Sequence, residues 1–144
     1  MGLSALFGLT EGARVTIDSA PLIYFLEGHR TFKPLYAPLF QAEADGLFEF
    51  VIATIAVAEV MTGPLRSGDE ALANRYRRAL SQWEVVPLDI DLAALAARLR
   101  VSHKLKLPDA IHAATAISTG SVALVTHDRD FSGLKGMRII NAGV

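Results

Sequence analysis

The sequence predicts a single α/β/α domain with a central, mostly parallel β-sheet. Short apolar runs bounded by polar residues alternate with longer segments whose apolar residues recur every three or four positions. The first pattern is typical of buried strands and the second of amphipathic helices. Strands separated by helices connect through right-handed crossovers, which produces a parallel sheet covered on both faces. The 144 residues have room for one such domain.

The first half of the chain predicts two strands and four helices. The expected elements are a strand over 15–18, helices over 21–28 and 34–45, a strand over 50–54, and helices over 56–61 and 69–82. Pro21 suits the opening turn of the first helix, and Gly28 suits its end. The pair Gly63-Pro64 is expected to stop the third helix. In the helix over 69–82, Leu72, Tyr76 and Leu80 form an apolar stripe at four-residue spacing.

The second half predicts three strands and two helices. The expected elements are a strand at 85–86, a helix capped by Asp89 or Asp91, a helix over 108–118, a strand over 122–126 and an edge strand over 137–140. Leucines and an alanine at i, i+3, i+4 and i+7 define the first of these helices. They are Leu92, Leu95, Ala96 and Leu99.

The domain is expected to span residues 14–144, with residues 1–13 as an N-terminal extension. The segment 1–10 lacks the basic start of a signal peptide. No stretch reaches the roughly 18–20 uncharged apolar residues of a membrane-spanning helix. The chain has no cysteine, which excludes disulfides and thiolate metal sites. We therefore expect a cytoplasmic protein without a membrane partner.

Four acidic residues lie where an expected strand ends or an expected helix begins. They are Asp18, Glu59, Asp109 and Asp128. Because ligands of an open parallel sheet bind beyond the carboxyl ends of its strands, we expect these side chains to meet in one crevice. Two carboxylates about 4–5 Å apart repel by about 3–4 kcal/mol at an effective dielectric of about 20. A divalent cation is therefore expected to offset their repulsion.

Each acid also has a plainer interpretation. Asp18 could cap a helix, Asp109 suits a first helical turn because of the helix dipole, and Asp128 could be an ordinary turn residue. Glu59 lies in the apolar segment 55–61, where a carboxylate is rarely buried without a partner. The placement of all four together favours a shared site.

Four short blocks contain these acids. They are Val15-Thr16-Ile17-Asp18-Ser19, Ala56-Val57-Ala58-Glu59-Val60, Leu107-Pro108-Asp109-Ala110-Ile111-His112-Ala113-Ala114-Thr115-Ala116 and Leu124-Val125-Thr126-His127-Asp128-Arg129-Asp130-Phe131. In order and spacing the blocks resemble the PIN domain ribonucleases, and among them the VapC-like toxins of bacterial toxin–antitoxin pairs. The resemblance implies that the four acids form a catalytic quartet supported by the hydroxyl of Thr126. The chain departs from the family at His127, where Asn is common.

The resemblance implies a Mg²⁺- or Mn²⁺-dependent endoribonuclease that acts as the toxin of a toxin–antitoxin pair. Sites made only of carboxylates suit such hard cations. Asp18 and Asp109 are expected to bind the metal directly, whereas Glu59 and Asp128 bind a second ion or orient waters. A metal-activated water would then attack the phosphodiester. The expected partners are RNA, a cognate antitoxin and a second copy of the chain.

Basic residues near the acids are candidates for contact with RNA phosphates. We expect Lys104, Lys106 and Arg129 to make such contacts. For the three arginines within 75–78, an RNA contact and a solvated helix face remain equally open. His112 is expected to pack beneath the sheet edge, outside the core site.

Two further expectations concern Asp130 and the first helices. Asp130 can face solvent in a turn or join the acidic set, and it is not counted in the core site. The first helices carry more large apolar side chains than one helix face readily buries, which favours a dimer or antitoxin contact there. These side chains are Leu22, Ile23, Tyr24, Leu35, Tyr36 and Leu39.

Other protein classes fit less well. Asp18 lacks the acidic neighbour of a receiver domain and the second acid of a haloacid-dehalogenase-like phosphatase, and no Walker loop is present. With 14 Lys and Arg against 15 Asp and Glu, net charge does not indicate nucleic-acid binding. The alternative function is a non-catalytic PIN-like module that recognises a protein partner or RNA.

Overall fold

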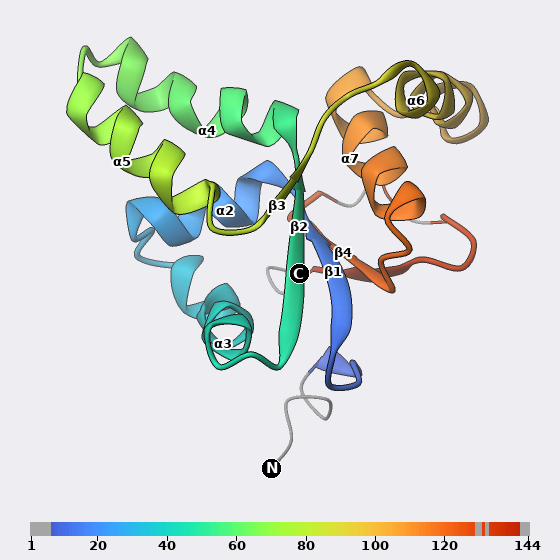
Figure 1. The fold of residues 1–144 in the computed structure, drawn as a ribbon, viewed down its shortest axis with the longest axis horizontal. Helices are drawn as coiled ribbons and strands as arrows, with labels where there is room; N and C mark the ends of the chain where they lie inside the picture. Colours follow the sequence, from blue (N-terminus) through green and yellow to red (C-terminus); the bar gives the residue numbers. More distant parts are fainter. Residues whose placement is uncertain (1–6, 129–130, 132, 142–144) are drawn as a thin grey trace.

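A computed structural model of the chain describes residues 7–128, 131 and 133–141. Within them, five strands form one parallel sheet in the order β3-β2-β1-β4-β5 (Figure 1). The strands are β1 (Ala13–Ile17), β2 (Phe48–Ala53), β3 (Glu84–Val86), β4 (Ala123–Val125) and β5 (Arg138–Ile140). The predicted α/β fold with a parallel sheet is confirmed.

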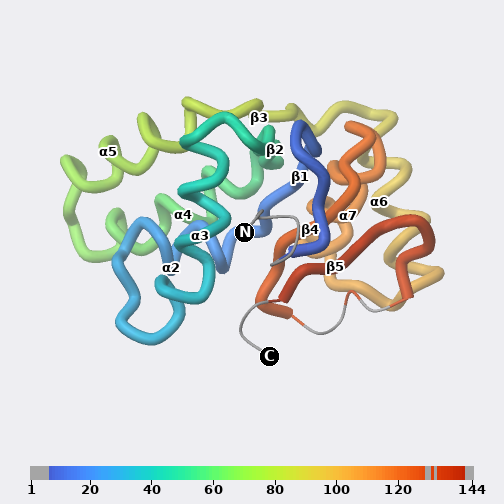
Figure 2. Tube along the Cα trace, turned by 90° about the horizontal axis from the view of Figure 1, so that it is seen from below, coloured from blue at the N-terminus to red at the C-terminus, as the bar shows by residue number. Residues whose placement is uncertain are grey.

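Helices cover both faces of this sheet. They are α2 (Ser19–Glu27), α3 (Lys33–Ala44), α4 (Thr54–Arg66), α5 (Glu70–Leu80), α6 (Ile90–His103) and α7 (Leu107–Ser118). Figures 1 and 2 show α2 to α5 on one side of the sheet and α6 and α7 on the other. The expected α/β/α layering therefore holds for the described residues.

Each face of the sheet contributes to its own hydrophobic core. Val15 and Phe50 belong to the core beneath α2 to α5, and Leu124 belongs to the core beneath α6 and α7. Complete burial of an aliphatic side chain contributes about 1.5–3 kcal/mol relative to exposure. A sheet buried on both faces therefore holds its strand ends, and the polar residues that follow them, in fixed positions.

The expected end of α4 is wrong. The helix continues through Gly63 and Pro64 to Arg66 instead of stopping before that pair. A proline removes one helical hydrogen bond, and burial of Pro64 and packing of α4 against α5 offset this loss. Helix α3 likewise contains Pro38 in its interior.

The first helices bury more apolar surface than expected. Leu22, Tyr36 and Leu39 are fully buried in the core, so they are not available to a partner. Leu35 remains 37% exposed. Ahead of β1, Leu9 is buried in the same core, so part of the segment before residue 14 packs with the domain.

Candidate active site

A cavity of about 510 Å³ lies at the carboxyl ends of β1 and β4. Three of the four predicted acids line it: Asp18, Asp109 and Asp128. Asp18 directly follows β1, Asp109 lies in the first turn of α7, and Asp128 follows β4. The parallel order of the strands therefore brings together side chains that are 110 positions apart in the sequence.

Asp18 is held by hydrogen bonds to both of its carboxylate oxygens. Its Oδ1 accepts from the backbone N–H of Ser19 at 2.7 Å, which caps α2. Its Oδ2 accepts from Thr126 Oγ1 at 2.8 Å. Thr126 Oγ1 in turn accepts from the backbone N–H of Asp128 at 3.0 Å. The residue is only 5% exposed, so the cap and the site are two roles of one fixed carboxylate.

Glu59 is connected to this group through His112. His112 Nε2 lies 2.8 Å from Glu59 Oε1 and 3.2 Å from Asp18 Oδ1. Glu59 extends from α4 and His112 from α7, so the imidazole joins helices on opposite faces of the sheet. Glu59 does not line the cavity directly. Its link to the site is the imidazole ring.

His112 is buried as expected, but it is part of the acidic group rather than separate from it. Burial alone lowers the pKa of His112, and the hydrogen bond with Glu59 and the charges of Asp18, Glu59 and Asp109 outweigh burial. The pKa of His112 is therefore raised above its ordinary value of 6.5. A protonated imidazole reduces the repulsion between Asp18 and Glu59. The expectation that repulsion among the acids requires a divalent cation was therefore incomplete.

The donor set fits a hard cation by chemistry, since three carboxylates face one cavity. Within the described part of the chain, however, no group of three or more His, Asp or Glu has the spacing that holds a metal ion. His112 Nε2 contacts one carboxylate oxygen of Asp18 and one of Glu59, and a cation would otherwise be able to bind these oxygens.

The sequence profile of the PIN domain matches residues 15–136, which is most of the chain. The chain belongs to the PIN domain family. Members of this family generally use divalent metal ions. A search among curated proteins gave no match.

Solved structures confirm the resemblance to VapC-like PIN domains. A toxin–antitoxin complex from Klebsiella pneumoniae contains a chain 32% identical to this one, with a TM-score of 0.68, covering 85% of this chain and 94% of that one. VapBC2 from Rickettsia felis, bound to a promoter DNA fragment, matches at 18% identity and a TM-score of 0.70, covering 89% and 98%. Mycobacterium tuberculosis VapC20, a Sarcin-Ricin loop cleaving toxin, matches at 17% identity and a TM-score of 0.67, covering 86% of this chain and 98% of that one. The last two comparisons support the fold.

The predicted RNA-binding residues of this PIN domain lie in different places. Lys106 is the N-cap residue of α7, directly before Leu107 and three residues before Asp109. Lys104 instead lines a separate groove with Arg100 and Val101. Arg129, like Asp130, lies outside the described residues. The three arginines of α5 are exposed, and the stripe around the buried Tyr76 faces inward.

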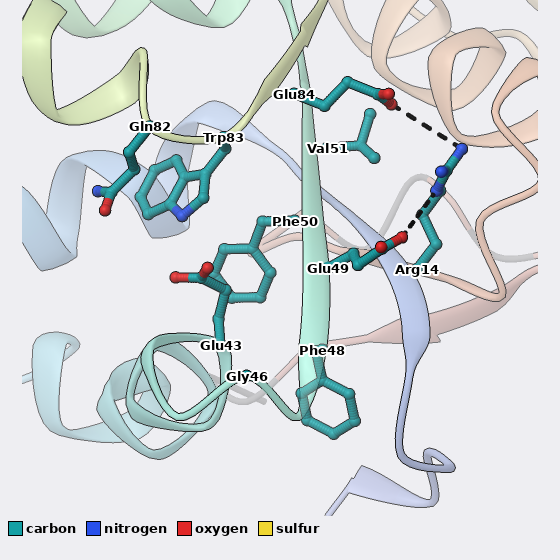
Figure 3. A pocket seen from close by; sticks show the side chains of 10 residues that line it. All are labelled: Arg14, Glu43, Gly46, Phe48, Glu49, Phe50, Val51, Gln82, Trp83 and Glu84. Carbon is teal, nitrogen blue, oxygen red and sulfur yellow. Dashed lines mark hydrogen bonds and ion pairs between the residues drawn. The ribbon is translucent and has the colours of Figure 1, made fainter.

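A second cavity in the PIN domain, of about 380 Å³, lies beside the beginning of β2 (Figure 3). Its acidic residues include Glu49 and Glu84, whose carboxylates lie 3.4 and 3.9 Å from the guanidinium of Arg14. Trp83 also lines it, and the indole Nε1 has no hydrogen-bond partner among the described residues. Ligands of parallel sheets bind at the opposite, carboxyl ends of the strands. We therefore assign the functional site to the cavity that contains Asp18.

No helix in the described part of the PIN domain is both long enough and apolar enough to span a membrane.

Proposed function

We propose that this PIN domain is a divalent-metal-dependent endoribonuclease and the toxin of a toxin–antitoxin pair. The observation that carries the proposal is the cavity at the carboxyl ends of β1 and β4, where Asp18, Asp109 and Asp128 converge. The hydrogen bond from Thr126 to Asp18 supports it, because it fixes one carboxylate toward that cavity. A phosphodiester is negatively charged and would be repelled by the carboxylates, and a bound cation would offset this repulsion.

Asp18, Asp109 and Asp128 would hold Mg²⁺ or Mn²⁺ through carboxylate oxygens. When bound, such an ion neutralises charge on the phosphate and makes a coordinated water more acidic. Asp18 contributes a preorganised oxygen because Ser19 and Thr126 restrict its rotation. His112, which Glu59 holds by a hydrogen bond, contacts the buried side of Asp18, and its protonated ring balances part of the negative charge.

Two protein partners follow from the same proposal. The Klebsiella pneumoniae chain belongs to a toxin–antitoxin complex, which supports an antitoxin as partner here. The partly exposed Ile23 and Leu35, on the first two helices, offer an apolar contact for an antitoxin segment or a second copy. Light scattering that finds only monomers at high micromolar concentration would contradict the homodimer.

A non-catalytic binding module remains the second candidate. The observation that favours it is the lack, among the described residues, of three acidic or histidine groups spaced to hold a metal ion. In that case the acids would recognise a basic segment of a protein, and a protonated His112 would offset part of their charge. The two functions differ in whether RNA is cleaved when Mn²⁺ is added.

An RNA-cleavage assay with a Mn²⁺ titration separates them. Wild type is expected to cleave RNA in millimolar Mn²⁺ and to lose cleavage in EDTA. Asp18→Asn keeps a side chain that can cap α2 but removes a charged metal ligand, so its rate should fall by at least about 100-fold. Asp91→Asn changes an exposed acid of α6 as the matched control and should retain the wild-type rate. Equal rates for wild type and Asp18→Asn would contradict the nuclease proposal.

A further inference from the structure

Four rings form an aromatic wall beside the acidic cavity: Tyr24, His29, Phe32 and His127. The Phe32 ring centroid lies 4.8 Å from that of Tyr24, 4.6 Å from that of His29 and 4.4 Å from that of His127. Tyr24 also meets His127 edge to face at 5.1 Å. Every ring of the wall is only partly buried, so the group is not a closed hydrophobic core.

The wall is held in place by hydrogen bonds at both ends. The backbone N–H groups of Thr31 and Phe32 donate to His29 Nδ1 at 3.2 and 3.0 Å. At the other end, the hydroxyl of buried Tyr36 donates to the carbonyl of Thr126 at 3.1 Å and lies 2.7 Å from His127 Nδ1. The buried Tyr36 hydroxyl therefore holds the His127 ring on its Nδ1 side.

Tyr24 and His127 line the same cavity as Asp18, Asp109 and Asp128. Phe32 contacts both of these rings. The lining of the cavity therefore combines acidic and aromatic side chains. The two kinds of side chain suit the two parts of a nucleotide, since a cation held by the acids attracts the phosphate and an aromatic face stacks with the base.

We propose that the aromatic wall binds an unpaired base of the RNA next to the phosphodiester that is cleaved. This inference rests on the proposed nuclease function and adds the side chains of this chain that would receive the base. Bases within an A-form duplex are stacked on each other and offer no free face to a protein ring. The stacking rings are Tyr24 and His127, and His29 and Phe32 hold them in position.

Fluorescence of 2-aminopurine tests this proposal without requiring cleavage. A single-stranded oligoribonucleotide containing 2-aminopurine is titrated with the Asp109→Asn protein, a variant that the nuclease proposal expects not to cleave RNA. Binding should quench the fluorophore through stacking. Tyr24→Leu in the same background should weaken affinity by about 5- to 150-fold and reduce quenching. Tyr24→Phe keeps the ring and should bind within about twofold of the parent.

Two controls separate stacking from other effects. An oligoribonucleotide with abasic sites should bind more weakly to the parent and should not respond to Tyr24→Leu. His127→Asn removes the second ring without changing α2, so it should also reduce quenching even if Tyr24→Leu lowers the melting temperature. Unchanged affinity and quenching in both variants would overturn the base site and leave the wall available to a protein partner. A loss of binding in Tyr24→Phe would overturn it too, because the hydroxyl would then be the essential group.

The outcome is independent of the nuclease test. If wild type fails to cleave RNA in Mn²⁺ but the base-dependent binding appears, the nuclease proposal fails and the base site stands. If wild type cleaves RNA but neither ring variant changes binding, the base site fails alone. A parent protein that binds neither oligoribonucleotide overturns the base site directly.

Discussion

Thr126 Oγ1 donates a hydrogen bond of 2.8 Å to Asp18 Oδ2, although 108 positions separate the two residues. Both residues lie at the ends of neighbouring strands, β4 and β1, which pair in parallel register. Thr126 is fully buried and also accepts the backbone N–H of Asp128. One hydroxyl therefore fixes the positions of two acids of the cavity relative to each other.

Replacing Thr126 with Val tests this role at nearly constant shape. The change leaves Asp18 Oδ2 and the Asp128 N–H without their partner, which should cost about 1–3 kcal/mol of unfolding free energy. RNA cleavage should fall as well, because Asp18 can then rotate. Thr126→Ser retains the hydroxyl and should stay close to wild type in both measurements. Urea denaturation that shows Val and Ser variants equally stable would exclude a structural role for the hydroxyl.

The raised pKa of His112 predicts that stability falls with rising pH. The folded protein holds the His112 proton more tightly than the unfolded chain, whose histidine titrates near 6.5. This contribution is therefore complete below about pH 6.5 and is lost as pH rises through the raised folded value. Urea denaturation between pH 5.5 and 9 measures the slope.

Glu59→Gln provides the matched variant for that slope. It removes the charge that hydrogen-bonds the imidazole, so the folded pKa of His112 should move down toward the unfolded value. The loss of stability should then still begin near pH 6.5, end at a lower pH than in wild type, and be smaller in total. An identical pH profile in wild type and Glu59→Gln would show that Glu59 does not raise the pKa of His112.

Lys106 and Lys104 are expected to differ in their contribution to RNA affinity. Lys106 lies at the start of the helix that positions Asp109, whereas Lys104 lines a different groove. Lys106→Ala should weaken binding to all RNA sequences alike. It should also reduce the slope of log affinity against log salt concentration by about 1, the value for one lost phosphate contact. Lys104→Ala should change neither quantity. The reverse result would place the RNA path across the groove beside α6.

The elements that build the site were predictable because their patterns are local. The apolar run before Asp18 defines β1, and the run before Thr126 defines β4, so the order of a parallel sheet brings their ends together. The resemblance to PIN domains then assigned Thr126 its role, and the hydrogen bond between Thr126 and Asp18 is consistent with that role. In the same way, Asp89 was expected as a possible cap and does cap α6, with its Oδ1 accepting from Leu92 N–H at 2.8 Å.

The role of His112 could not be read from the sequence. Its spacing to Asp109 places both on α7, but its closest partner is Glu59 on α4, 53 positions away. Only the packing of two helices against one sheet end determines that distance. The end of α4 was missed for a related reason, since local rules describe the cost of Pro64 but not the packing against α5 that offsets it.

Manganese binding to Asp109→Asn tests the central claim most directly, namely that the acids of this cavity hold a divalent cation. In calorimetry and thermal melts, wild type should bind Mn²⁺ and melt higher in its presence, because a ligand that binds only the folded state stabilises it. Asp109→Asn should lose most of this binding and most of the shift, whereas Asp91→Asn on the exposed face of α6 should keep both. The same Mn²⁺ affinity and the same melting shift in Asp109→Asn and wild type would contradict the claim.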